Sequence, residues 1–131
     1  MILIDTSVWI ELLYGRAPGP DRDQILSVVT CGPVVQEVLQ GLLDGPDADG
    51  FRESFLELPC LEDPVSRSLY QSAASIYRDG RRRGFTIRSS MDCLIAAIAL
   101  EHEAVVWHRD RDFPIIARYT PLLQRNDSPF V

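Results

Sequence analysis

The sequence is poor in residue types that often carry chemistry: it has no lysine, two histidines and three cysteines. The cysteines, Cys31, Cys60 and Cys93, form no Cys-x-x-Cys pair, so their spacing fits neither a zinc site nor a disulfide framework. We therefore expect a reducing, cytoplasmic location. The histidines, His102 and His108, show no ligand spacing. We expect each to lie on the surface or to contact the residues of a site without binding a metal itself.

Long apolar runs and an excess of positive charge are also missing. No stretch approaches the roughly 18 residues of a membrane span. The apolar start of the chain stops at Asp5 without the basic flank of a signal peptide, so we expect neither membrane insertion nor secretion. The net charge of −6 over 131 residues argues against a general polyanion binder. It is compatible with a nucleic-acid enzyme whose acids are neutralised by metal ions.

The chain instead contains short apolar segments that alternate with helical ones. Short apolar or extended runs predict strands at Met1–Ile4, Thr30–Gly32, Leu58–Leu61, Ala104–Trp107 and Tyr119–Leu123. Helical spacing predicts helices at Ser7–Tyr14, Asp21–Val29, Pro33–Leu43, Ala48–Glu57, 63–80, 90–100 and Phe113–Ala117. This alternation predicts an α/β sandwich with a mostly parallel sheet, in a single domain covering residues 1–131.

Two of these helices carry more specific expectations. Thr6 or Ser7 is expected to cap the first helix. The long helix that begins at Asp63–Pro64 is expected to bury one apolar stripe, which consists of Val65, Leu69, Ala73, Ile76 and Tyr77.

Carboxylates stand where helices and strands begin or end. Asp5 follows the first apolar strand, the position at which open α/β sheets place ligands. Asp92 lies in the first turn of a helix that is apolar nearly all round, and Glu37 lies in another apolar helix. Asp110 and Asp112 follow the second buried strand in the turn HRDRDF. Jointly, the acids predict a site at one edge of the sheet.

Each acid also has a plainer interpretation. Asp5 can simply cap the next helix, and Asp92 can be only a helix-start acid. Glu37 can share a solvated face with Gln36 and Gln40, and the acids of HRDRDF can form a charged surface turn. The joint pattern is more specific than any single residue.

The segments IDTSVWI, QEVLQG, SSMDCLIAAIA and HRDRDF, in this order, resemble the PIN-domain ribonucleases. More narrowly, they resemble the VapC toxins of bacterial toxin–antitoxin pairs, over essentially the whole chain. The resemblance implies a PIN-like three-layer α/β/α sandwich. It also implies a shared divalent-metal site whose four ligands are Asp5, Glu37, Asp92 and Asp110. Asp112 is an accessory to the fourth ligand, Asp110, or an alternative to it, and Thr6 or Ser7 lines the site.

The chemistry of these residues agrees with that implication. Clustered carboxylates repel one another, so their presence on a stable fold implies a cation. Hard oxygen ligands suit Mg²⁺, for which Mn²⁺ can substitute. We therefore expect a metal-dependent endoribonuclease that hydrolyses RNA phosphodiesters and leaves 5′-phosphate and 3′-hydroxyl ends. The resemblance adds cleavage of tRNA or ribosomal RNA, which arrests translation.

The resemblance also implies partners. The chain would pair with a second copy of itself in a homodimer, and the homodimer would bind a VapB-type antitoxin in a heterotetramer or a larger assembly. A peptide of the antitoxin would lie along a groove and place a basic residue near the acids. The alternative is a catalytically silent PIN-like binding module that acts with an antitoxin at an operator. A phosphatase built around Asp5 is disfavoured, because the chain has no lysine to pair with a phosphoryl group.

Arginines gather in the second half of the chain, beside the proposed site. The planar fork of arginine binds two phosphate oxygens at once. Residues expected to contact RNA precede the SSMD helix or flank the fourth acid, and they are Arg81, Arg82, Arg83, Arg88, Arg109 and Arg111. For Arg81–Arg83 the plainer interpretation is charge that caps a helix end and aids solubility.

Overall fold

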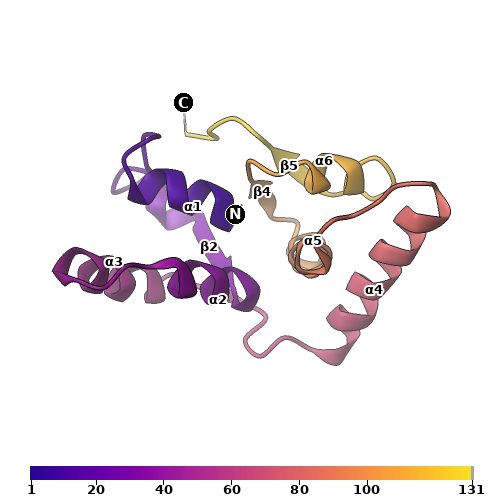
Figure 1. Ribbon diagram of the computed structural model, residues 1–131, viewed down its shortest axis with the longest axis horizontal. Helices are drawn as coiled ribbons and strands as arrows, with labels where there is room; N and C mark the ends of the chain where they lie inside the picture. The colour runs from indigo at the N-terminus through magenta and orange to yellow at the C-terminus, as the bar shows by residue number, and fades with distance from the viewer. Residues whose placement is uncertain (131) are drawn as a thin grey trace.

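The computed structural model describes residues 1–130 and contains one five-stranded sheet (Figure 1). The strands are β1 (Ile2–Ile4), β2 (Val28–Cys31), β3 (Cys60–Leu61), β4 (Val105–Trp107) and β5 (Leu123–Arg125). Their order is β3-β2-β1-β4-β5, and every pairing is parallel. The sheet expected to be mostly parallel is thus parallel at each of these pairings.

Helices connect the strands on both faces of the sheet. They are α1 (Thr6–Leu13), α2 (Gly32–Gly41), α3 (Pro46–Leu56), α4 (Arg67–Arg82), α5 (Ser90–His102) and α6 (Asp112–Ile116), with a short 3₁₀ helix η1 (Gln24–Ser27). The chain steps one way from β1 to β3 and the other way from β3 to β5. Because parallel crossovers are right-handed, this reversal places α1–α3 on one face and α4–α6 on the other. The three-layer α/β/α prediction is confirmed.

The core lies on the sheet and around α5. The strand residues Leu3, Ile4 and Val106 have no exposed surface, as short apolar runs covered on both faces require. In α5 every side chain from Asp92 to Ala99 is buried. A carboxylate in the first turn of this helix therefore lies inside the protein rather than on its surface.

Aromatic packing joins the helices of the first face. The ring of Trp9 on α1 meets Phe51 and Phe55 of α3 edge-on, with ring centroids 5.9 and 5.2 Å apart. None of the helices within residues 1–130 is both long and apolar enough to cross a membrane.

The helix predicted for Asp21–Val29 is wrong. The segment holds only the four-residue η1, and the chain then enters β2 at Val28. The apolar residues used for the prediction, Ile25, Val28 and Val29, include two that lie in the strand. Valine is stiff at its first side-chain torsion and favours a pleated surface, so β2 accommodates both valines.

The long helix and the edge strand also differ from expectation. α4 begins at Arg67, because Ser66 caps it with its side chain, and not at Asp63–Pro64. Tyr77 is exposed rather than part of the buried stripe. β5 begins only at Leu123, because the hydroxyl of Tyr119 donates to the carbonyl of Ile76 and ties the preceding segment to α4.

Candidate metal centre

The predicted acids gather at the carboxyl edge of the sheet. Asp5 directly follows β1, and Asp110 lies in the turn that follows its neighbour β4. Glu37 is carried by α2, which begins where β2 ends. α5 brings Asp92 to the same edge from the second layer. Parallel neighbouring strands end on the same side of a sheet, which is why residues far apart in the chain converge here.

Asp5 is both a helix cap and a member of the cluster. Its Oδ2 accepts hydrogen bonds from the backbone N–H and the hydroxyl of Ser7, at 3.2 and 2.6 Å. Asp5, and not Thr6 or Ser7, is therefore the N-cap of α1. Burial raises the pKa of the Asp5 carboxyl, the Ser7 hydrogen bonds partly offset this rise, and the nearby charge of Asp110 adds to it.

Asp92 is the most perturbed acid of the cluster. Burial, followed by the charges of Asp110 and Asp5, raises its pKa to about 9. Its Oδ2 is buried without a hydrogen-bond partner within residues 1–130, and so is the hydroxyl of Thr6. Buried polar atoms are normally satisfied, so the Asp92 oxygen, which belongs to the carboxylate cluster, is open to a ligand from outside the chain.

Asp110 and Asp112 complete the acidic cluster in different ways. One carboxylate oxygen from each of Asp92, Asp110 and Asp112 can be chosen so that all three lie within 4.8 Å of one another. Asp112 is fully buried, and its Oδ2 accepts backbone N–H groups of Arg88 and Ser89, both at 3.1 Å. Asp112 thus holds the loop before α5, whereas Asp110 is half-buried and accepts the N–H of Asp112 at 2.9 Å.

Glu37 faces the same cluster from α2. It is half-buried, whereas Gln36 and Gln40 on the same helix are exposed. Burial raises the pKa of Glu37, and the charges of Asp5 and Asp110 raise it further. This electrostatic coupling places Glu37 at the rim of the cluster rather than on a separate solvated face.

His108 is fully buried, so a surface position for it is wrong and a supporting one is what the structure shows. Its Nδ1 accepts the backbone N–H of Asp110 at 3.0 Å. An N–H can only donate, so Nδ1 carries no proton, and Nε2 donates to Oε1 of Gln124 at 2.6 Å. The imidazole thus ties the Asp110 turn to β5.

Ser7 links the ends of β1 and β4. Its hydroxyl donates to Asp5 and accepts the backbone N–H of Arg109 at 3.0 Å. Sequence reasoning named Ser7 as a residue lining the site but did not predict this bridge. The bridge forms because β1 and β4 are neighbouring strands. No local sequence pattern predicts which strands are neighbours.

The six predicted arginines are exposed and fall into two groups. Arg81, Arg82, Arg83 and Arg88 lie at the end of α4 and in the loop before α5. Arg109 and Arg111 lie in the turn after β4. The guanidinium of Arg109 pairs with Glu11 at 3.0 Å and also contacts Asn126, so it already has partners within the protein.

The residues present fit a divalent cation. All candidate ligands are carboxylate oxygens, the donors that hard cations prefer. Burial, and after it the repulsion between the acids, raises the pKa of Asp5, Glu37 and Asp92, and a bound cation would relieve that repulsion. The unsatisfied Oδ2 of Asp92 is one oxygen that such an ion would bind.

Comparison with known proteins places the chain in a family. The PIN domain family matches residues 2–119. Ribonuclease VapC11 from Mycobacterium tuberculosis is 42% identical over 133 residues, which cover 93% of this chain and 96% of that protein.

Solved structures agree on the fold at low sequence identity. VapBC-1 from nontypeable Haemophilus influenzae is 18% identical, with a TM-score of 0.69 over 95% of this chain and 97% of that one. VapBC-5 from M. tuberculosis, described as a member of the VapBC family of toxin–antitoxin systems, is 20% identical, with a TM-score of 0.66 over 93% and 94%. The chain therefore belongs to the PIN-domain family and, within it, to the VapC ribonucleases.

Proposed function

We propose that this protein is a metal-dependent endoribonuclease and the toxin of a toxin–antitoxin pair. The observation that carries the proposal is the carboxylate cluster of Asp92, Asp110 and Asp112, whose oxygens can lie within 4.8 Å of one another, with the charge of Asp5 close enough to raise the pKa of Asp92. Membership among the VapC ribonucleases supports it. We further propose that residues 1–131 form one domain of this kind and that the protein acts in the cytoplasm, where its RNA substrate lies.

Within the site, Asp5, Asp92 and Asp110 hold the cation, and Glu37 completes the set from the rim. Asp112, whose oxygens accept two backbone N–H groups, positions Asp110 and the loop before α5 and is accessory to these four acids. We propose Mg²⁺, with Mn²⁺ as a substitute, because the donors are all hard oxygens. When bound, such an ion activates water and offsets negative charge on the phosphate.

The chain's own residues supply the remaining functions. Glu37, half-buried and with a raised pKa, is suited to accept a proton at the rim. RNA phosphates are contacted by exposed arginines, namely Arg81, Arg82, Arg83, Arg88 and Arg111. Arg109 also contacts a phosphate while its guanidinium stays paired with Glu11. The substrate is tRNA or ribosomal RNA, and its cleavage arrests translation.

The partners follow from the family. We propose a homodimer that joins a VapB-type antitoxin in a heterotetramer or a larger assembly, supported by the fold shared with VapBC-5, described as a toxin–antitoxin system. A catalytically silent module acting at an operator would not need several buried acids that repel one another. Titration with Mn²⁺ separates the two, since a silent scaffold need not bind the ion.

The test is RNA cleavage with mapped ends. The wild-type protein should cut RNA with Mg²⁺, leave 5′-phosphate ends and lose activity in EDTA. Asp92→Asn should lower the rate by more than about 100-fold while the protein stays folded, because the site loses a charged ligand. Glu53→Gln, an exposed acid on α3, is the matched control and should cleave normally. Full activity of Asp92→Asn would rule the proposal out.

A further inference from the structure

A pocket lies between α4 and α5, outside the acidic cluster. It is open to solvent and has a volume of about 560 Å³. Its walls include aromatic, basic and apolar side chains, namely Tyr70, Tyr77, Arg78, Arg81, Met91 and Leu94. The tyrosines are 55% and 36% exposed, so this part of α4 presents aromatic rings that the fold does not cover.

The pocket combines two kinds of recognition chemistry. Tyr77 and Arg81 sit one turn apart on α4, with the guanidinium carbon 5.9 Å from the ring centroid. Aromatic rings stack on unpaired bases, and arginine binds phosphates or stacks as well. An apolar ligand would not need the arginines, and a bare phosphate would not need the rings. An unpaired nucleotide uses both.

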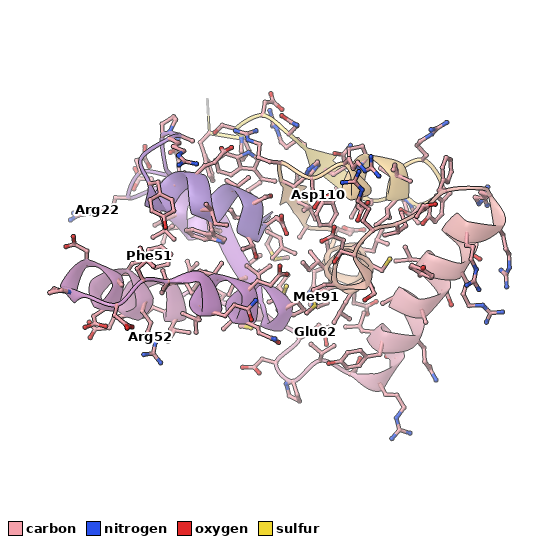
Figure 2. The ribbon with its side chains drawn as sticks, viewed as in Figure 1. Arg22, Phe51, Arg52, Glu62, Met91 and Asp110 are labelled. Carbon is pink, nitrogen blue, oxygen red and sulfur yellow. The ribbon has the colours of Figure 1, made fainter. Side chains whose placement is uncertain are left out.

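The position of the pocket connects it with the acidic cluster. Ser90 and Met91 line it and directly precede Asp92 in α5. Figure 2 shows Met91 and Asp110 on either side of α5, which is seen end-on. Because Ser90, Met91 and Asp92 are consecutive in the first turn of α5, a strand of RNA with a phosphate at the acids has its neighbouring nucleotide within reach of the pocket.

Charge favours a polyanion at this pocket. The protein carries a net charge of −6, yet the last turns of α4 and the residue after it hold Arg78, Arg81, Arg82 and Arg83. Arg82 pairs with Asp79 at 2.8 Å, whereas Arg78 and Arg81 line the pocket. This concentration of positive charge, in a protein that is acidic as a whole, complements the phosphates of RNA.

We propose that the α4–α5 pocket binds one unstacked nucleotide of single-stranded RNA, next to the phosphate held at the acidic cluster. The base stacks on Tyr77 or Tyr70 against the apolar wall of Met91, and Arg78 and Arg81 bind its phosphates. The inference rests on the endoribonuclease function proposed above. It adds that the substrate is recognised in an unpaired segment, because a duplex keeps its bases stacked and out of reach.

The test is binding of a fluorescent single-stranded RNA in EDTA, where no cleavage occurs, compared with a duplex of the same sequence. Tyr77→Leu should weaken single-strand binding by about 5-fold or more and leave duplex binding unchanged, because stacking of one base is lost. Tyr77→Phe should bind like the wild type, since it keeps the ring. Arg81→Gln should lower the salt dependence, the slope of log affinity against log salt, by about 0.7.

Arg52→Gln on α3 is the matched control, since Arg52 is exposed and lies away from α4 and α5 (Figure 2). Its RNA affinity and salt slope should match those of the wild type. Thermal melts of each variant show that it is folded.

Three outcomes would overturn the inference. In the first, Tyr77→Leu binds single-stranded RNA like the wild type while the wild type still cleaves RNA, so the pocket is refuted and the nuclease stands. In the second, Tyr77→Leu shifts the protein to monomers in light scattering without weakening RNA binding, so a second copy covers the pocket. In the third, the wild type neither binds nor cleaves RNA, and both proposals fail.

Discussion

Removal of the buried imidazole of His108 should weaken metal binding without direct loss of a ligand. In His108→Leu the side chain keeps its packing volume beside Phe113, whose ring centroid lies 5.0 Å from the imidazole. The variant loses the hydrogen bonds to the N–H of Asp110 and to Gln124. The Asp110 turn then has one fewer contact that fixes its direction.

The size of the effect follows from the two hydrogen bonds that the imidazole makes in the structure. An unsatisfied buried N–H costs roughly 1–3 kcal/mol of unfolding free energy. Loss of a residue that orients a metal ligand typically costs about 10- to 100-fold in metal affinity. We therefore expect His108→Leu to be less stable and to bind Mn²⁺ at least about 10-fold more weakly, measured on folded protein at 25 °C.

Isothermal titration with Mn²⁺ is the assay, and Gln36→Ala on the exposed face of α2 is its control. Gln124→Ala removes only the distant partner of the imidazole, so it should cause a smaller loss of the same kind. If His108→Leu melts earlier but binds Mn²⁺ as tightly as the wild type, His108 supports the fold alone and the positioning role is refuted.

Two further predictions follow from the acids. The pKa of Asp92 is raised to about 9, so the metal-free protein holds a proton there that Mn²⁺ must displace. The affinity for Mn²⁺, measured between pH 6 and 8, should therefore rise by up to about 10-fold per pH unit. An affinity that does not change with pH would contradict this prediction. Without metal the same raised pKa stabilises the fold at low pH, and this contribution is lost as pH rises toward 9. Urea unfolding in EDTA should show a stability that falls by at most about 1.4 kcal/mol per pH unit from this group, a slope that Asp92→Asn should lack.

The sequence could predict the fold where apolar patterns are continuous. Within the run Met1–Ile4, Ile2–Ile4 form β1 with Leu3 and Ile4 buried, and the apolar body of α5 is buried as well, since only the protein interior suits such continuous apolar runs. The segment 21–29 was misassigned, because a short apolar spacing is shared by a helical turn and a strand. The prediction that Tyr77 belongs to the buried stripe of α4 was wrong. The contact with α5 buries only Leu69, Ala73 and Ile76 of that stripe, which is narrower than the stripe that helical spacing indicates.

The sequence predicted which acids gather at the candidate site but not the hydrogen bonds that hold them in place. Asp5, Asp92 and Asp110 stand at strand and helix ends, which local patterns mark. The roles of His108 and Ser7 arise from contacts across the sheet, with Gln124 on β5 and the N–H of Arg109 after β4. Such hydrogen bonds exist only once β1, β4 and β5 lie side by side.

The proposed function requires a shared cation bound by acids from distant parts of the chain. Its most direct test is an anomalous difference map from a crystal of the protein soaked with Mn²⁺. We predict one strong peak within about 2.5 Å of carboxylate oxygens of Asp5, Asp92 and Asp110. A saturated soak with no peak among these three acids, or with a peak elsewhere, would contradict the account.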